Sequence, residues 1–161
     1  MAVDMFIKID GIKGESYDSK HKDEIDILAW SWGASNSGTS HSGGGGGAGK
    51  VNVNDISITK YLDKASPALL GKCCQGDHIK EALLTVRKAG GKNPLEYIKL
   101  QLWDVLVSSI STGGSGGEDR LTENITLNFA KFKMEYTPQK ADGSAEGAMP
   151  YSYDIKLNKP C

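Results

Sequence analysis

Apolar and polar residues alternate along most of this 161-residue chain, which is the pattern of half-buried β-strands. The alternation slips by one position near Leu28, within Val51–Tyr61 and near Ala130, as it does where a β-bulge adds a residue to a strand. The predicted strands are Val3–Ile9, Glu24–Gly33, Val51–Tyr61, Glu81–Ala89, Leu95–Ser109, Leu121–Tyr136, and a last strand through Tyr151, Tyr153, Ile155 and Leu157.

One segment between these strands has the capping residues of a helix. Ser66 can act as its N-cap, Pro67 suits the first helical position, and Gly76 suits the C-terminal cap after Gln75. With a single short α-helix, the chain is predicted to be mainly β: a compact antiparallel β-barrel or sandwich with a long Gly-rich extended loop. At this length we expect one domain, residues 1–161.

The strand Leu95–Ser109 carries apolar residues on both of its predicted faces. Ile98, Leu100 and Leu102 alternate on one face, and the other face carries Trp103, Val105 and Val107. A small barrel needs only one apolar face per strand, so part of this surface is expected to lie between subunits. We therefore predict Trp103, Val105 and Val107 as subunit-interface residues.

The loop between the second and third strands, residues 34–50 (ASNSGTSHSGGGGGAGK), contains alanine as its only apolar residue type. Such a segment cannot build a core of its own, so we predict a flexible surface arm that can become ordered against a neighbouring chain. The arm residues assigned to this contact are Ser40, His41, Gly45 and Lys50.

The arm also matches the G-x-x-x-x-G-K spacing of phosphate-binding loops through Gly44, Gly49 and Lys50. The motif requires Ser or Thr next and a following helix, whereas Val51 begins a predicted strand. A nucleotide-binding protein is therefore the less favoured alternative.

Charge and composition exclude several other classes. The net charge of -1 and the pI near 6.3 give no support for nucleic-acid binding. No apolar run is long enough to span a membrane, so we expect no membrane insertion. The start MAVDMFIKI lacks the basic residues and continuous apolar run of a signal peptide, so we expect none.

Groups with catalytic or metal-binding potential lack the necessary context. Cys73, Cys74 and His78 do not have the ligand spacing of a zinc site. Ser115 lies in a Gly-rich loop before a strand, not in a strand-to-helix elbow. The acidic pairs and clusters, which could flank a glycosidic bond, are more typical of solvated loop ends: Glu118 with Asp119, and Asp23 with Glu24 and Asp26. We expect no catalytic residues, no cofactor and no metal, and hence no enzyme.

Several segments together resemble one known family, the haemolysin-coregulated proteins (Hcp), which are inner-tube subunits of type VI secretion systems. They are MAVDMFIKI, EIDILAWSWG, GGGGGAGKV, SITKYLDKASPALL, LTVRKAGG and VLVSSISTGGSGGEDRLTENITLNF. The resemblance covers essentially the whole chain except the last residues, Lys159–Cys161. It implies a tight β-barrel with a helix, homohexameric rings that stack into a tube, and expulsion by a contractile sheath.

The resemblance also implies partners: the VgrG spike and small secreted effectors carried inside the ring. Ala29 and Ser31, opposite the tryptophans of their strand, have small side chains that suit a wall facing a water-filled lumen. We expect synthesis in the bacterial cytoplasm and export to the extracellular space or into target cells by type VI secretion. The alternative from another class is a monomeric ligand-binding β-barrel.

Overall fold

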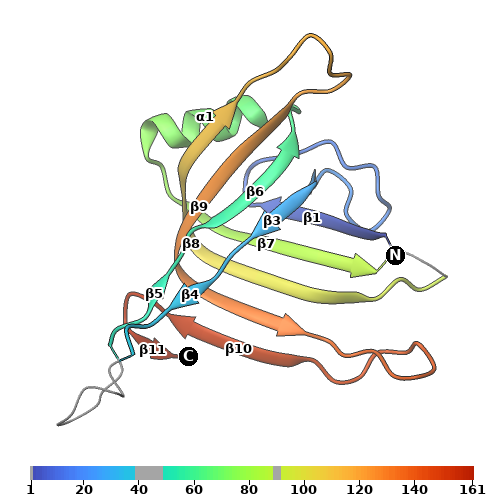
Figure 1. Cartoon of the computed structure of the whole chain (residues 1–161), viewed down its shortest axis with the longest axis vertical. Coiled ribbons are helices and arrows are strands. Elements are labelled where there is room, and N and C mark those ends of the chain that lie inside the picture. Colours follow the sequence, from blue (N-terminus) through green and yellow to red (C-terminus); the bar gives the residue numbers. More distant parts are fainter. Residues whose placement is uncertain (1, 39–48, 89–91) are drawn as a thin grey trace.

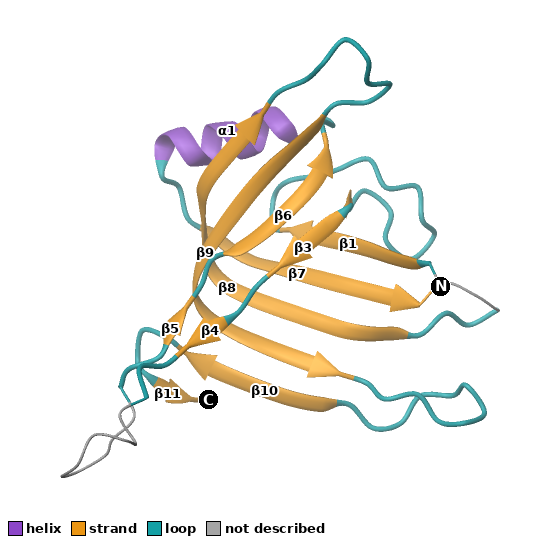
Figure 2. Cartoon of the chain, in the orientation of Figure 1, coloured by secondary structure: helices purple, strands orange, loops and turns teal. Residues whose placement is uncertain are grey.

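The computed structural model describes residues 2–38, 49–88 and 92–161. Strands dominate it, and one helix lies at one end of the sheet (Figure 2). That helix is too short and polar to cross a membrane, and no other helix occurs in the described ranges. In chain order the elements are β1 (Val3–Ile9), β2 (Ile25–Asp26), β3 (Ala29–Ser31), β4 (Ala34–Ser35), β5 (Asn52–Val53), β6 (Ile56–Tyr61), α1 (Ser66–Gln75), β7 (Ile79–Lys88), β8 (Glu96–Thr112), β9 (Thr122–Tyr136), β10 (Met149–Asp154) and β11 (Lys159–Pro160).

The slip in alternation predicted at Leu28 marks the point where the chain changes its pairing partner from β1 to β6. The Ile27 N–H donates to the Met5 carbonyl of β1 at 2.9 Å, and the Leu28 N–H donates to the Thr59 carbonyl of β6 at 2.8 Å. The predicted strand Glu24–Gly33 is therefore two short strands, β2 beside β1 and β3 beside β6. This segment bridges the two halves of the fold across their shared core.

All strand pairs are antiparallel, and β9 is the common neighbour of three strands. It pairs with β8 along its length; its first half also pairs with β6 and its second half with β10. Figure 1 shows the result: β6 and β3 run beside the upper part of β9, and β10 lies at the opposite edge. The burial pattern of β9 changes phase near Ala130, as predicted, but the predicted β-bulge is wrong, because Phe129 pairs with Val105 and Lys131 with Trp103 without a shift of register. The Ala130 carbonyl accepts the Ile155 N–H at 2.8 Å, at the point where β10 replaces β6 as the second neighbour of β9.

The helix ends as predicted and begins differently. Gly76 adopts the left-handed conformation at φ 65°, and its N–H donates to the Lys72 carbonyl, so the C-cap prediction is confirmed. The N-cap prediction for Ser66 is wrong. Ala65 occupies the cap position, and the Ser66 hydroxyl points to a buried ion pair and accepts the Asp63 N–H at 3.0 Å.

The core shows why two apolar faces were wrongly predicted for β8. Asp104 has a left-handed backbone at φ 54°, which resets the alternation by one position. Leu100, Leu102, Val105 and Val107 consequently all enter the same core and are at most 2% exposed. The prediction that Val105 and Val107 lie at a subunit interface is thus corrected, because they have no surface to present. Trp103 remains half-buried on the opposite side of the sheet, under the Lys131 ammonium at 4.8 Å.

An ion pair lies in this core where an apolar pair would be expected. Lys60 of β6 is opposite Glu123 of β9, both are fully buried, and the Nζ to Oε1 distance is 2.5 Å. Lys60 also donates to Ser66 Oγ at 3.2 Å and approaches Asp63 Oδ1 at 3.0 Å. These contacts tie the first turn of α1 to the sheet, and they satisfy all three ammonium protons.

Removal of one partner of this pair is expected to be costly. Lys60→Met leaves the Glu123 carboxylate buried without its cation and should reduce the free energy of unfolding by about 3–5 kcal/mol. The double substitution Lys60→Met with Glu123→Leu should recover most of that loss, because no unpaired charge then remains at the fully buried position. The Asp63 carboxylate loses its cation but still accepts the Ala65 N–H at 3.0 Å. Urea unfolding at one fixed protein concentration measures both variants. A loss below about 1 kcal/mol in the single variant would contradict the assigned role.

Candidate functional site

One solvent face of the sheet consists of small polar side chains. It is formed by β3, β6, β9 and β8, where the register places residues in two cross-strand rows. None of these side chains is charged, and none is larger than Asn. The rows are Ala29, Thr59, Asn124 and Ser111, and beside them Ser31, Ser57, Thr126 and Ser109. We call these eight residues the polar wall.

Hydrogen bonds between neighbouring strands fix the side chains of the polar wall. Thr59 donates to Asn124 Oδ1 at 2.6 Å, and the Ser109 and Thr126 hydroxyls are 2.6 Å apart. A carboxylate at its edge, Asp55, accepts from Ser108 at 2.6 Å and from Asn128 at 2.8 Å. Two pairs of wall side chains, Thr59 with Asn124 and Ser109 with Thr126, thus bond to each other, and the eight residues present no charge. Both residues predicted for a lumen, Ala29 and Ser31, lie on this wall.

The core face of the sheet continues beyond the region that β3 and β6 cover. One cross-strand row runs from Ile7 through Leu84, Leu100 and Met134 to Tyr151. The first three side chains are at most 1% exposed, Met134 is half-buried, and Tyr151 is 55% exposed. The row is therefore core at one end and open surface at the other.

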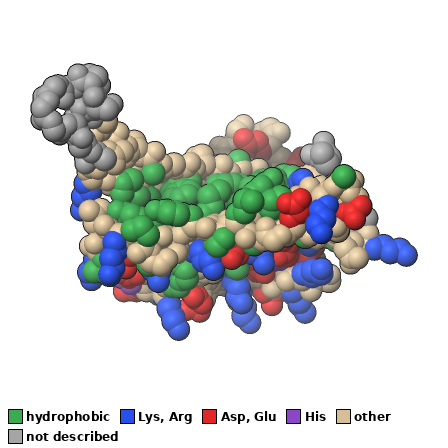
Figure 3. Space-filling model, turned by 90° about the horizontal axis from the view of Figure 1, so that it is seen from below, with side chains coloured by type: hydrophobic (Ala, Val, Ile, Leu, Met, Phe, Trp, Pro, Cys, Tyr) green, Lys and Arg blue, Asp and Glu red, His purple; other side chains and the backbone are tan. Residues whose placement is uncertain are grey.

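The row on one side repeats this gradient. Val86 is buried, Ile98 is half-buried, Tyr136 is 45% exposed and Met149 is 63% exposed. Figure 3 shows apolar side chains as a continuous band along one face, bordered by charged groups. We call the open part of this band, on β9 and β10, the apolar shelf: Met134, Tyr136, Met149 and Tyr151.

The base of the arm borders the apolar shelf. β4 pairs with β5 at Ala34 with Val53 and at Ser35 with Asn52, and the Gly49 N–H donates to the Ser37 carbonyl at 3.3 Å. The prediction of a flexible arm over all of residues 34–50 is thus corrected at both ends, which form a hairpin. Ser40, His41 and Gly45 lie outside the described residues.

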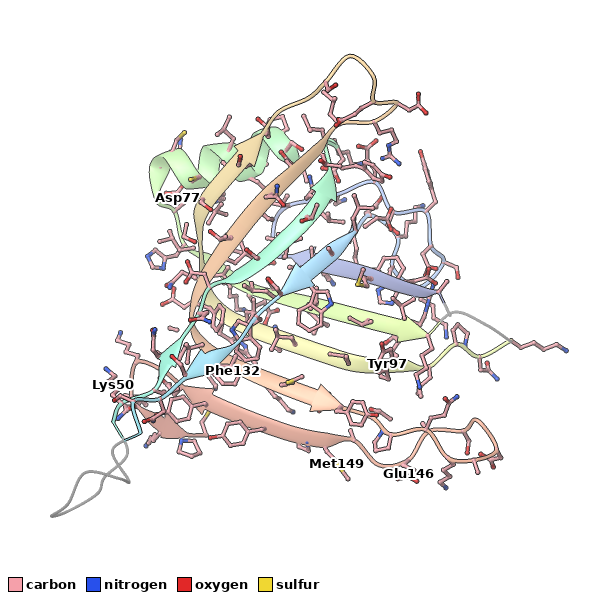
Figure 4. All side chains as sticks on the ribbon, in the orientation of Figure 1. Lys50, Asp77, Tyr97, Phe132, Glu146 and Met149 are labelled. Atoms are coloured by element: carbon pink, nitrogen blue, oxygen red, sulfur yellow. The ribbon has the colours of Figure 1, made fainter. Side chains whose placement is uncertain are left out.

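An open groove of about 360 Å³ separates this hairpin from β9 and β10 (Figure 4). One side of it includes Lys50, Val51 and Val53, and the other includes Phe132, Tyr151 and Tyr153. Tyr153 is held by its hydroxyl, which donates to Asn158 Oδ1 at 2.6 Å. Lys50 is followed by a strand, as predicted, so the helix N-terminus that a phosphate-binding loop requires does not follow it.

Acidic side chains that are adjacent in sequence separate in the structure. The Glu24 carboxylate bonds to His21, whereas Asp26 lines an open pocket of about 450 Å³ with Glu15, Asp63 and Arg120. Burial raises the pKa of Asp26, opposed by a hydrogen bond from Ser16 and the charge of Arg120. Hydrogen bonds from Ser144 lower the pKa of the exposed Asp142. The Glu24 and Asp26 carboxylates thus have separate partners and do not form a catalytic pair.

The candidate zinc ligands are likewise separate. His78 Nδ1 lies 2.6 Å from Asp104 Oδ1, and Cys73 and Cys74 are free thiols. Among the described residues no group of three or more His, Cys, Asp and Glu side chains is placed to hold a metal ion.

The sequence signal for the apolar shelf was available in part. The alternating Tyr151 and Tyr153 were assigned to a strand, but alternation does not show whether an aromatic face is covered by another layer. Only the sheet order, which places β10 outside the region facing β3 and β6, shows that it is open.

Known proteins match this chain over nearly its whole length. The family model described as type VI secretion system effector, Hcp, matches residues 6–136. Protein hcp1 of Pseudomonas aeruginosa is 64% identical over 159 residues, covering 98% of each chain.

Solved structures agree with both sequence matches. Hcp1 from Salmonella typhimurium has a TM-score of 0.83 at 42% identity, with full coverage of both chains. A structure of a type six secretion system protein has a TM-score of 0.93 at 34% identity, covering 99% of this chain and 100% of the other. A type VI secretion system effector from Yersinia pestis has a TM-score of 0.77 at 40% identity and covers 94% and 99%.

The extent of the family match and the identity to these relatives confirm the resemblance first drawn from sequence segments, and the chain belongs to the Hcp family of type VI secretion proteins.

Proposed function

We propose that this chain is an inner-tube subunit that closes into homohexameric rings, stacks ring on ring, and carries small effectors in the lumen. In this proposal residues 1–161 act as one tube-forming domain. Export by type VI secretion brings the VgrG spike and the contractile sheath as partners, with no nucleic acid and no cofactor. The alternatives of a monomeric ligand-binding barrel and a nucleotide-binding protein have no specific observation in their favour in the described residues.

The apolar shelf is the observation that carries the proposal. It continues the chain's own core without a break, from Ile7 at 0% exposure to Tyr151 at 55%. An apolar face that is continuous with a core, and that stays exposed among the described residues, has the character of an obligate interface. A neighbouring subunit is the occupant that this proposal assigns to it. Trp103, on the opposite side of the sheet, remains a second candidate contact.

The polar wall supports the lumen assignment of Ala29 and Ser31. A passage for varied cargo requires a surface that binds water well and presents no fixed charge or large side chain. The two rows meet both requirements. The arm, with Ser40, His41, Gly45 and Lys50, is assigned to contacts between subunits or between rings.

The first prediction tests the ring. Light scattering and native mass measurement of the purified protein should give a hexamer, and Tyr151→Asp should reduce it to monomers by placing a charge in the shelf. Because Tyr151 is largely exposed within one chain, the fold itself should remain, as circular dichroism would show. Tyr17→Asp is the matched control, since Tyr17 is 96% exposed in a loop away from the shelf and should leave the hexamer intact. A wild-type monomer at micromolar concentration contradicts the proposal.

The second prediction tests the lumen. Ser31→Gln should leave the ring assembled, because an exposed substitution typically changes stability by no more than about 0.5 kcal/mol, while it alters effector retention by crowding the wall. Ser31→Ala removes the hydroxyl without crowding and serves as the control. Co-purification of effector with ring measures retention. Dissociation of the Ser31→Gln ring would place this residue in an interface instead.

The third prediction tests the arm. Deletion of Ser40–Gly47 removes almost no apolar area, and loop-closure entropy changes by only about 0.6 kcal/mol per doubling of length. Thermal unfolding should therefore change little, whereas ring stacking and secretion should decrease. Electron microscopy of tubes and secretion assays report the second effect. Loss of the folded protein on deletion would assign the arm to the subunit fold.

A further inference from the structure

A loop between β1 and β2 covers the outer face of the sheet, on the side away from the main core. We call residues 13–24 the strap. It folds on itself through the Gly14 N–H to the Asp23 carbonyl at 2.8 Å and the Ser16 N–H to the Glu24 carbonyl at 3.0 Å. Phe6, which stacks on His21 of the strap, is 4% exposed, and Thr85, paired with Phe6 on β7, is 1% exposed, although both face away from the core. The strap therefore makes a small second layer on β1 and β7.

One ionic contact holds the strap to β7 over a wide pH range. The Arg87 guanidinium donates to both oxygens of Asp18, at 2.6 and 3.1 Å, and to Asp4 of β1 at 3.0 Å. Hydrogen bonds from Arg87 hold the pKa of Asp18 well below its usual range, and the same pair raises the pKa of Arg87. This contact keeps its charges at any pH near neutrality.

The second contact depends on a proton. The His21 ring stacks on Phe6 at 4.3 Å; its Nδ1 lies 2.8 Å from Glu24 Oε2, and its Nε2 lies 2.6 Å from Glu96 Oε1 of β8. A neutral imidazole has one N–H, and an ionised carboxylate can only accept. Both distances can be hydrogen bonds at the same time only when His21 is an imidazolium. The ring is 7% exposed, so water cannot readily take the place of the lost donor.

We propose that the strap is a proton-dependent latch, closed by the His21 imidazolium bridging Glu24 and Glu96, and released when His21 loses its proton. Release loosens residues 13–24 from β1 and β7 and uncovers Phe6 and Thr85. The Asp18 to Arg87 contact remains as a tether, so the strap opens without leaving the protein. The inference is independent of the proposed tube function, because it concerns a surface within one chain.

The charges around the His21 imidazole determine whether the strap opens as pH rises or as it falls. The strap supplies Glu24 and Asp18, β1 supplies Asp4, β7 supplies Arg87, and β8 supplies Glu96 with Lys99 at 3.6 Å from it. When His21 becomes neutral, one carboxylate faces a nitrogen lone pair at a buried position. Repulsion then replaces attraction at one of the two nitrogens. Both His21 contacts of the latch are therefore present while His21 is protonated, and one of them is lost as pH rises.

The test compares local opening of the strap with the charge of the His21 imidazole. Hydrogen exchange on assembled protein gives protection factors for the Gly14, Ser16 and Asp23 amides, corrected for the intrinsic rate at each pH. Between about pH 6 and about pH 9 these should fall by at least about tenfold, the effect of losing one charge-assisted hydrogen bond. The β7 amides should not follow. Imidazole ¹⁵N shifts should report His21 as doubly protonated at the lower pH.

Three variants isolate the latch. His21→Gln removes the titrating group, so protection of the strap should be low and independent of pH. Glu96→Gln removes one carboxylate and should reduce the change of protection with pH. It serves as the second test if His21→Gln does not fold. Lys22→Gln alters an exposed neighbour in the same segment and should behave as wild type.

Asp26 requires a separate control, because it contacts the strap through Ser16 and burial raises its pKa. Asp26→Asn should retain the response. Constant protection in the wild type, a neutral His21 at the lower pH, a response that persists in both His21→Gln and Glu96→Gln, or one that disappears in Lys22→Gln or Asp26→Asn would each overturn the proposal.

Discussion

One apolar sheet face is longer than the other described elements of the chain cover, and the architecture follows from this constraint. From Ile7 to Leu100 the face is closed by β3, β6 and the first half of β9. From Met134 to Tyr151 the side chains change from half-buried to exposed, and Tyr151 lines the open groove beside the base of the arm. Exposure of such a face to water is unfavourable by about 25 cal/mol per Å² of apolar area, and covering it by another chain would recover this free energy.

The division into covered and uncovered halves originates in two strands. β8 and β9 both change phase where Asp104 lies between the pairs Trp103 with Lys131 and Val105 with Phe129. Since the two strands change together, their pairing continues through the kink. Beyond it, β9 exchanges β6 for β10 as its second neighbour. A single left-handed residue thus lets one hairpin serve two layers without breaking its ladder.

The sequence predicted elements well where local chemistry determines them. β1, the end of α1 at Gly76 and the phase change near Ala130 all follow from alternation or from the properties of glycine. Alternation alone could not reveal the positive φ of Asp104, because a polar residue in the middle of a strand does not indicate a left-handed backbone. It therefore assigned Val105 and Val107 to the wrong side. His21 and Glu96 are 75 residues apart, so no local pattern could bring them together.

The candidate surfaces were predictable to different degrees for the same reason. Ala29 and Ser31 stand out because small residues alternate with tryptophans, and this is visible within five positions. The other members of the polar wall come from β6, β8 and β9, and only their register makes them one surface. The buried Lys60 and Glu123 read as ordinary exposed charges in a strand until that register places them opposite each other. Long-range pairing, which sequence periodicity does not encode, decides each of these cases.

The kink also links the two candidate surfaces mechanically. The first half of β9 carries Asn124 and Thr126 of the polar wall, and the second half carries Met134 and Tyr136 of the apolar shelf. Both halves belong to one continuous strand, and both pair with β8, with a shift of register between Val107 and Ser109. The angle between wall and shelf is therefore set within the subunit and does not depend on flexible loops. If the shelf meets a neighbour in a ring, that angle fixes the direction in which the wall faces, so the same backbone that closes the ring orients its lumen.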